Sequence, residues 1–379
     1  MKKAIQLGAG NIGRGFIGSL LSQSGYHVIF ADVTEKVVNQ INTDKAYTIH
    51  VMDTECTQER VENISAVFSN KEEFIDAMKE AEILTTAVGP NVLKIVAPTI
   101  AKGIKARREA QINEYFNIIA CENALNASSA LKENVYQSLD DEDKAYADKY
   151  IGFPNSSVDR IVPPANCENP IDVVVEKYYE WNVEKAGFKG EIPNIVGMNL
   201  ADNLLAYVER KLFTLNTGHA ISAYLGALKG HQTVDQSIND PEIYQVVKAA
   251  MKESGDGLIK KYDFDADAHG EYIEKIITRF KNTHLKDDVS RVGREPLRKL
   301  SQTDRLIKPM QTALSYHLPV DHLVVGAAGA LKFVNPEDPQ SVNLQNDIKE
   351  KGVVQVIKDV TGITDETVVH SIAAKYDEL

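Results

Sequence analysis

The chain has 379 residues, of which 43% are hydrophobic and 25% are charged. These values are ordinary for a globular protein and exclude a disordered chain, a collagen-like repeat and a disulfide scaffold. At about 100–200 residues per domain, the length predicts two domains, or three. The formal net charge of −12 disfavours nucleic acid and anionic membranes as partners. No apolar run approaches the ~18–20 residues that span a bilayer.

The N-terminus and the cysteines indicate where the chain resides. The stretch after Met1 is too short for the apolar core of a signal peptide, and no small-residue cleavage site follows it. The three cysteines form no motif and are odd in number; they are Cys56, Cys121 and Cys167. We therefore expect a cytoplasmic protein without structural disulfides.

Strand-like and helix-like stretches alternate through roughly the first 190 residues, which favours a doubly wound parallel sheet. The strand-like runs are 4–7, 27–31, 83–88 and 117–121, and the helical patterns are 15–24, 72–80 and 92–108. A β-branched and aromatic run, 171–181, predicts one or two strands added at the edge of that sheet.

The second half of the chain is mostly helical, with helical patterns at 200–215, 243–262, 268–279, 305–318 and 323–333. Gly190 and Pro193 mark a break between the part of the sequence in which strands and helices alternate and the mostly helical part. We therefore predict an α/β domain over residues 1–192 and a helical domain over residues 193–379.

A glycine motif, G-x-G-x-x-G, follows the first strand directly and opens a helix. Such glycines permit a tight turn, a close approach of the backbone to a pyrophosphate, and close packing of helix on strand. Asp32 ends the second strand, where an acid would bind the ribose hydroxyls and repel a 2′-phosphate, so NAD is favoured over NADP. The alternative is a plain turn followed by a helix-capping Asp. The expected cofactor-binding residues are Gly8, Ala9, Gly10, Asn11, Ile12, Gly13, Asp32, Val88 and Gly89.

Lys211, Asn216 and His219 fall within one arc of a predicted helix. Alcohol oxidation needs a base for the hydroxyl proton and donors for the developing oxyanion, and these three side chains supply both. The straight helix would separate Lys211 from His219 by about 12 Å, so either Thr217-Gly218 bends the helix or His219 binds a neighbouring hydroxyl. An amphipathic helix with a solvated Lys, a capping Asn and a His at the edge of the core would give the same pattern.

No metal-binding motif accompanies these residues, since neither H-E-x-x-H nor C-x-x-C occurs. We expect no metal, although a site assembled from distant residues stays open. Residues 279–308 hold nine Lys or Arg and four acidic residues, a local excess of five positive charges. This stretch is either a solvated face or a site for a substrate phosphate. The candidates for phosphate are Arg298, Arg305 and Lys308; Asp159-Arg160, a structural ion pair or a cleft pair, is the alternative.

The sequence resembles the polyol-specific long-chain dehydrogenase family over nearly its whole length. The resemblance rests on residues 8–18, 30–33, 85–90, 119–123 and 209–220, on Phe153 with the run from Val158 to Pro164, and on Arg305-Leu306-Ile307-Lys308-Pro309. It implies a Rossmann-type domain followed by a helical domain, a lysine base at Lys211, and no zinc. It also implies partner roles for Asn216 and His219, and a second oxyanion-hole asparagine at Asn123.

The resemblance further implies NAD-dependent, reversible oxidation of D-mannitol 1-phosphate at C5 to D-fructose 6-phosphate, so a sugar phosphate is the expected partner. Two alternatives remain: a related dehydrogenase of a non-phosphorylated polyol or a hexuronate, and an NAD-binding sensor without catalysis. The sequence is compatible with a monomer and with a homodimer.

Overall fold

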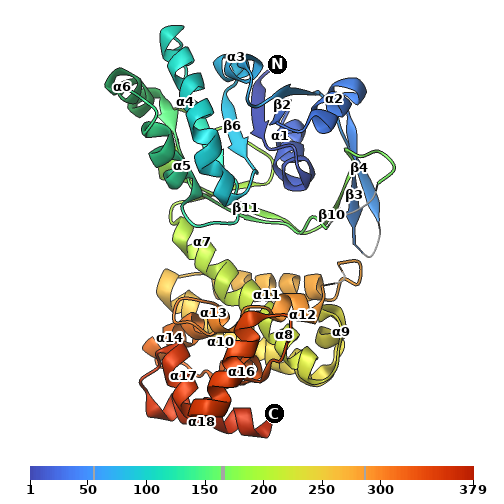
Figure 1. Cartoon of the computed structure of the whole chain (residues 1–379), viewed down its shortest axis with the longest axis vertical. Coiled ribbons are helices and arrows are strands. Elements are labelled where there is room, and N and C mark those ends of the chain that lie inside the picture. Colours follow the sequence, from blue (N-terminus) through green and yellow to red (C-terminus); the bar gives the residue numbers. More distant parts are fainter. Residues whose placement is uncertain (54–55, 164–166, 286) are drawn as a thin grey trace. The chain divides into compact units, whose positions relative to one another are not determined.

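The computed structural model describes residues 1–53, 56–163, 167–285 and 287–379, so Pro164 and Lys286 of the stretches above lie outside the described residues. The chain divides into two compact units, Met1–Tyr207 and Val208–Leu379. Each unit is described by itself below (Figure 1).

The first unit is built on a six-stranded sheet in which every neighbouring pair is parallel. Its order is β5 (Ile64–Phe68), β2 (His27–Asp32), β1 (Lys3–Leu7), β6 (Ile83–Thr86), β7 (Phe116–Ala120) and β8 (Ile151–Gly152). This is the doubly wound order in which the chain reverses direction beside the first strand. The predicted doubly wound sheet is therefore confirmed.

Successive residues of β1 face opposite sides of the sheet, and each side carries its own apolar core. Ala4 packs with the π-helical turn η1 (Gly13–Ile17), α1 (Gly18–Gln23) and α2 (Glu35–Asp44). Ile5 packs on the other side with four helices, which Figure 1 shows together: α3 (Glu72–Glu80), α4 (Leu93–Glu109), α5 (Ala127–Tyr136) and α6 (Asp141–Tyr150). Both faces are thus covered, as in an α/β domain.

The strands expected at the edge of the main sheet lie elsewhere, so that part of the prediction is wrong. The run 171–181 contributes to two small sheets, β10 (Val173–Glu176)-β3 (Tyr47–Met52)-β4 (Thr57–Val61) and β12 (Met198–Ala201)-β11 (Glu180–Glu184)-β9 (Ser156–Asp159). Their apolar residues, among them Val173, Val175 and Trp181, join the core that contains η1. These strands therefore cover the first helical turn instead of extending the sheet.

The segment of residues 193–207, which follows the break at Gly190 and Pro193, belongs to the first unit. β12 pairs in parallel with β11, from Met198 opposite Trp181 to Ala201 opposite Glu184. Because this pairing holds residues 198–201 in a sheet of the first unit, the chain leaves that unit only after Tyr207. The sequence prediction places the boundary earlier, after residue 192, where Gly190 and Pro193 lie in a loop of the first unit.

The second unit is helical, as expected from its sequence pattern. Its helices are α7 (Leu204–Arg210), which begins in the first unit, η4 (Lys211–Asn216), α8 (Thr217–Leu228), α9 (Val234–Asn239), α10 (Pro241–Tyr262), α11 (Ala266–Phe280), α12 (Val289–Gly293), α13 (Pro296–Lys299), α14 (Ile307–Ser315), α15 (Asp321–Lys332), α16 (Pro339–Lys351), α17 (Val353–Thr361) and α18 (Glu366–Glu378). Aspartates cap several N-termini; Asp240, for example, accepts from the backbone N–H groups of Glu242 and Ile243.

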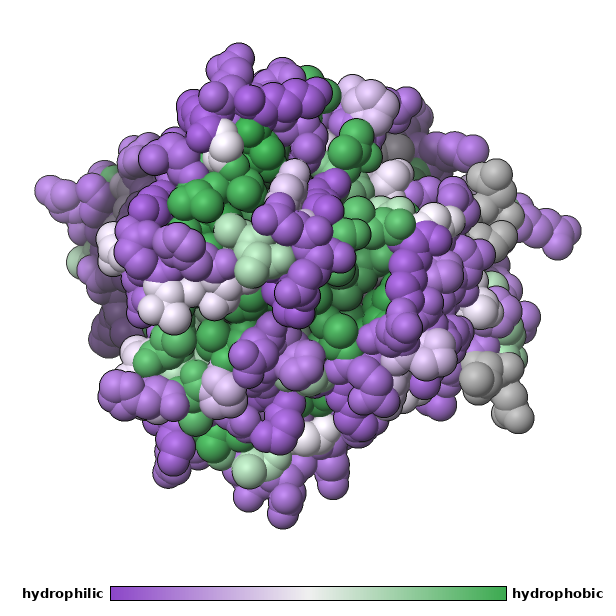
Figure 2. Space-filling view, turned by 90° about the horizontal axis from the view of Figure 1, so that it is seen from below, coloured by the Kyte–Doolittle hydropathy of each residue, from purple (hydrophilic) through white to green (hydrophobic). Residues whose placement is uncertain are grey.

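Helices at the surface of this unit are amphipathic, whereas α8 and α15 are buried along most of their length. In α17, Val356 and Ile357 are buried while Gln355 and Asp359 form an exposed i,i+4 pair. Figure 2 shows the outcome on one face, where hydrophilic side chains surround and separate apolar areas. None of the helices in the described part of the chain is long and apolar enough to cross a membrane.

Candidate functional site

The glycine turn after β1 needs two of its glycines for steric reasons. Gly8 has φ +93°, and a Cβ there would lie 2.4 Å from the carbonyl oxygen of Ala87. A Cβ on Gly13 would lie 1.9 Å from the carbonyl oxygen of Gly8. Gly10 differs, because a Cβ there would meet no atom within 4 Å. The turn thus packs on Ala87 at Gly8, closes on itself at Gly13 and leaves open space at Gly10, as a phosphate cradle requires.

We expect Gly13→Ala and Gly10→Ala to fail in different ways. Gly13→Ala should destabilise the fold by about 2 kcal/mol or more, because its methyl group collides with rigid backbone. Gly10→Ala should keep the melting temperature and weaken NADH binding at least about tenfold, about 1.4 kcal/mol, because its methyl group occupies the open space. Thermal melts and NADH titrations of both variants check this, and a stable Gly13→Ala protein with unchanged NADH affinity would contradict it.

Asp32 closes the turn from β2. Its Oδ2 accepts from the backbone N–H of Ala9 at 2.7 Å, and its Oδ1 accepts from that of Thr34 at 2.9 Å. Asp32 is partly exposed and Ala9 is buried, whereas Asn11 and Ile12 at the start of the helix are exposed. The sequence pattern predicts that Asp32 binds a ribose or caps a helix, and the structure shows that its carboxylate also orders the glycine turn.

A buried acid, Glu122, organises the next part of this sheet edge. It accepts from Thr86 Oγ1 at 2.7 Å and from the backbone N–H groups of Val88 and Gly89 at 3.0 and 2.9 Å. Asn123 follows it and is exposed. Sequence reasoning gives Glu122 no role; an acid immediately after the mostly apolar run 117–121 was the available signal. The first unit thus brings residues 8–13, Asp32, Val88, Gly89 and Asn123 to the carboxyl ends of β1, β2, β6 and β7.

Arg160 ties the helical turn η1 to the small sheets. Its guanidinium donates to the carbonyl oxygens of Gly15 at 3.0 Å and Glu176 at 3.1 Å. It also lies 5.1 Å from the ring centroid of Tyr179. These contacts support a structural role for this arginine within the first unit.

In the second unit, Lys211 and Asn216 are the two ends of the π-helical turn η4. An α-helix would place residues five apart at widely different angles around its axis. A π-helix hydrogen-bonds from residue i to i+5, so residues five apart lie above one another. The turn therefore brings Lys211 and Asn216 to the same side of the chain, and the departure from straight helix precedes Gly218.

Hydroxyl groups support the carbonyls of this turn. Ser254 Oγ donates to the carbonyl oxygen of Phe213 at 2.6 Å. Thr217 Oγ1 lies 2.6 Å from the carbonyl oxygen of Arg305 and 3.1 Å from that of Leu212. Because π-helical turns are rare and occur frequently at functional sites, the turn and its supports mark this segment as a candidate site.

His219 lies beyond the turn and is held by an acid. Its Nε2 is 2.7 Å from Asp287 Oδ2, and its ring stacks on Phe280 with centroids 5.2 Å apart. Burial lowers the pKa of His219 to about 3, and the charges of Arg279 and Arg291 act in the same direction. The neutral ring therefore donates from Nε2 to Asp287 and retains Nδ1 as an acceptor. The charges of Arg305 and Lys299 also lower the pKa of His219.

The three cations predicted to bind phosphate do not share one partner. Arg298 and Arg305 both pair with Asp304, at 2.6 and 2.8 Å. Lys308 pairs with Glu209 at 2.7 Å. These contacts divide the predicted trio into a pair and a single lysine.

Glu209 lies two residues before Lys211, and sequence reasoning assigns it no role in the site. It is buried and accepts from Lys261 at 2.6 Å and Tyr262 Oη at 2.8 Å, in addition to Lys308. Burial would raise the pKa of Glu209, but these three hydrogen bonds outweigh burial and lower it. An ionised acid therefore anchors the helix immediately before the π-helical turn.

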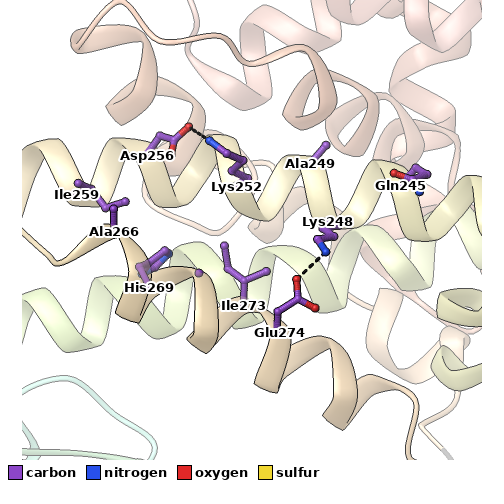
Figure 3. Close-up of a pocket in the computed structure, with 11 residues that line it drawn as sticks. Gln245, Lys248, Ala249, Lys252, Asp256, Ile259, Ala266, His269, Ile273 and Glu274 are labelled. Carbon is purple, nitrogen blue, oxygen red and sulfur yellow. Dashed lines mark hydrogen bonds and ion pairs between the residues drawn. The ribbon is translucent and has the colours of Figure 1, made fainter.

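A groove of about 400 Å³ runs between α10 and α11 (Figure 3), and none of the predicted site residues lines it. His269 lies along it and is 5% exposed, with Nε2 3.4 Å from Thr214 Oγ1 in the π-helical turn. Burial lowers the pKa of His269 to about 4, and Arg210 acts in the same direction.

His269 should make the stability of the protein depend on pH. Its pKa is about 4 in the fold against 6.5 ordinarily, so between these pH values the unfolded chain binds the proton. The stabilisation is complete above pH 6.5 and is lost as pH falls toward 4, by about 3 kcal/mol in full. The melting temperature of His269→Phe should therefore fall less over this range than that of the wild type. His370→Phe, at an exposed position, is the control, and identical slopes for all three proteins would contradict the prediction.

Among the residues that the structure describes, no group of three or more His, Cys, Asp or Glu side chains could hold a metal ion.

Comparison with known proteins gives two family matches that together cover most of the chain. The mannitol dehydrogenase Rossmann domain matches residues 2–197, and the mannitol dehydrogenase C-terminal domain matches residues 203–379.

Two solved structures share the fold across the whole chain. A D-sorbitol dehydrogenase in substrate-free form matches with a TM-score of 0.85 and 14% identity, covering 99% of this chain and 93% of that one. The Pseudomonas fluorescens mannitol 2-dehydrogenase ternary complex with NAD and D-mannitol matches with a TM-score of 0.70 and 16% identity, covering 100% of this chain and 92% of that one.

Proposed function

Because the chain belongs to the mannitol dehydrogenase family, we propose that it is an NAD-dependent polyol dehydrogenase with D-mannitol 1-phosphate as its substrate. The reaction is reversible oxidation at C5 to D-fructose 6-phosphate. The observation that carries the proposal is the π-helical turn, which brings Lys211 and Asn216 to one side of the chain. A base and a hydrogen-bond donor so arranged suit an alcohol whose oxygen gains negative charge as hydride leaves.

The first unit fits a dinucleotide. Open space at Gly10 and the helix that begins at Asn11 suit a pyrophosphate, because the first N–H groups of a helix are unpaired and attract anions. Asp32 keeps lone pairs for ribose hydroxyls, since each of its oxygens accepts only one backbone N–H in the contacts above. NAD, when bound, supplies the hydride acceptor.

The remaining groups act on the polyol. Lys211 removes the hydroxyl proton during oxidation and returns it during reduction. The amide N–H groups of Asn216 donate to the hydroxyl oxygen, whose charge grows in the transition state. Asn123, in the first unit, is the second oxyanion-hole asparagine that the resemblance implies. His219, neutral and held by Asp287, orients a neighbouring substrate hydroxyl by accepting its hydrogen at Nδ1.

The cations around His219 support a phosphorylated substrate. Arg279, Arg291, Arg305 and Lys299 all lower the pKa of this histidine, in a chain whose net charge is −12. Asp287 and Asp304 pair with Arg291 and Arg305, so two acids stand against these basic residues and the local charge remains positive. A local positive charge attracts a dianionic phosphate and disfavours a neutral polyol by comparison. Of the three predicted phosphate ligands, Arg305 has this additional support, whereas Arg298 and Lys308 rest on the sequence alone.

An NADH-absorbance assay tests the proposal. We expect turnover with D-mannitol 1-phosphate, with kcat/KM at least about 100-fold above that for free D-mannitol, since charged hydrogen bonds to a phosphate contribute about 1.5–3 kcal/mol each. Higher salt should narrow the difference. Equal turnover of free mannitol, free sorbitol or a hexuronate would identify a dehydrogenase of non-phosphorylated substrates. No NADH with any of these substrates would favour a sensor.

A further inference from the structure

Glu122 is 5% exposed and lies two residues after the end of β7. Its three hydrogen bonds come from the hydroxyl of Thr86 and the backbone N–H groups of Val88 and Gly89. The two backbone N–H groups can only donate and the hydroxyl can donate, so a carboxylate, which only accepts, satisfies all three of these contacts. Within the described part of the chain, no Lys or Arg forms an ion pair with Glu122, so donors alone offset its buried charge.

The order of the sheet places this charge in the half of the cofactor site that faces away from Asp32. Asp32 ends β2, on one side of β1, while β6 and β7 lie on the other side. In doubly wound folds the acid at the end of the second strand binds the adenosine ribose, so the nicotinamide half lies toward β6 and β7. The nicotinamide ring is positively charged in NAD⁺ and neutral in NADH.

We propose that Glu122 sets the relative affinity of the protein for the two forms of its cofactor, by favouring NAD⁺ over NADH. The carboxylate attracts the charged ring and has no such interaction with the neutral one, while the phosphate charges are the same in both forms. Glu122 is buried and Val88 and Gly89 beside it are only partly exposed, so the attraction is less screened than in water. This inference rests on the proposed use of NAD but is independent of the polyol.

The test is a calorimetric titration of the full-length protein with NAD⁺ and with NADH, without any polyol. We expect Glu122→Gln to raise the ratio of Kd for NAD⁺ to Kd for NADH at least about fivefold, the effect of one unit charge within about 15 Å at an effective dielectric constant near 20. Glu133→Gln, an exposed substitution on α5 with the same change in net charge, should leave the ratio unchanged.

A second pair of variants separates charge from loop geometry. Glu122→Asp keeps the charge, so both affinities can fall but the ratio should stay near that of the wild type. If Glu122→Gln does not fold, the double variant Thr86→Val, Glu122→Leu removes the charge together with its side-chain donor and fills the same space. The inference would be overturned if the charge-removing variant weakened the binding of NAD⁺ and of NADH equally. It would also be overturned if Glu122→Asp changed the ratio of the two Kd values as much as the charge-removing variant does. A wild-type protein that binds neither nucleotide would overturn the cofactor proposal itself.

Discussion

Lys211→Met should lower kcat for polyol oxidation by about 10³-fold or more while leaving the Kd for NADH within about twofold, because general-base catalysis contributes about 10²–10⁴-fold. Methionine keeps most of the apolar stem and the helical propensity of lysine, so η4 should persist. The loss should appear in kcat more than in KM, since the proton is removed only in the reaction. Steady-state kinetics and an NADH titration measure the two quantities.

Lys260→Met is the matched control, because Lys260 is exposed on α10 and its loss changes the net charge equally. Its kinetic constants should equal those of the wild type. Normal turnover by Lys211→Met would exclude the lysine-base mechanism. Loss of wild-type activity with a chelator, restored by added metal, would also contradict it, since the proposed proton transfer uses only an amine.

The parts of the fold that follow from local pattern were predictable. Ala4 and Ile5 belong to opposite cores, and a strand buried on both faces gives the short apolar run that the sequence displays. The glycine motif is equally local as a sequence pattern, and the steric need of Gly13 arises within the turn, against the carbonyl of Gly8. The contact that requires Gly8, with Ala87, comes from a distant segment. Both features were therefore visible before any contact was known.

The features that could not be predicted from the sequence depend mostly on pairing between distant segments. Val173–Glu176 forms a strand in either arrangement, and only its partner, β3, decides which sheet it joins. The π-helical turn at Lys211 retains a helical pattern, so its register change has no clear sequence signal. The roles of Glu122, Asp287 and Asp304 as partners likewise arise from residues far apart in the sequence, or from loops. Candidate side chains were thus identifiable, while their hydrogen-bond partners were not.

The double variant Asp32→Ser, Val33→Arg should shift cofactor preference from NAD toward NADP by about 100-fold or more in the ratio of kcat/KM values, since charged hydrogen bonds contribute about 1.5–3 kcal/mol each. The substitution removes the charge that repels a 2′-phosphate and adds a guanidinium at Val33, which is 66% exposed beside it. Serine retains an oxygen that can accept from the Ala9 N–H, so the glycine turn should stay ordered.

The single variants locate the effect within this pair. Val33→Arg alone should change the preference little, because Asp32 would pair with the new guanidinium and still repel the phosphate. Asp32→Ser alone should relax the preference mainly by weakening NAD. If the double variant kept the wild-type preference at an unchanged melting temperature, Asp32 would have only its observed role, that of ordering Ala9 and Thr34, and the discrimination between the two cofactors would have to arise from other residues at the end of β2.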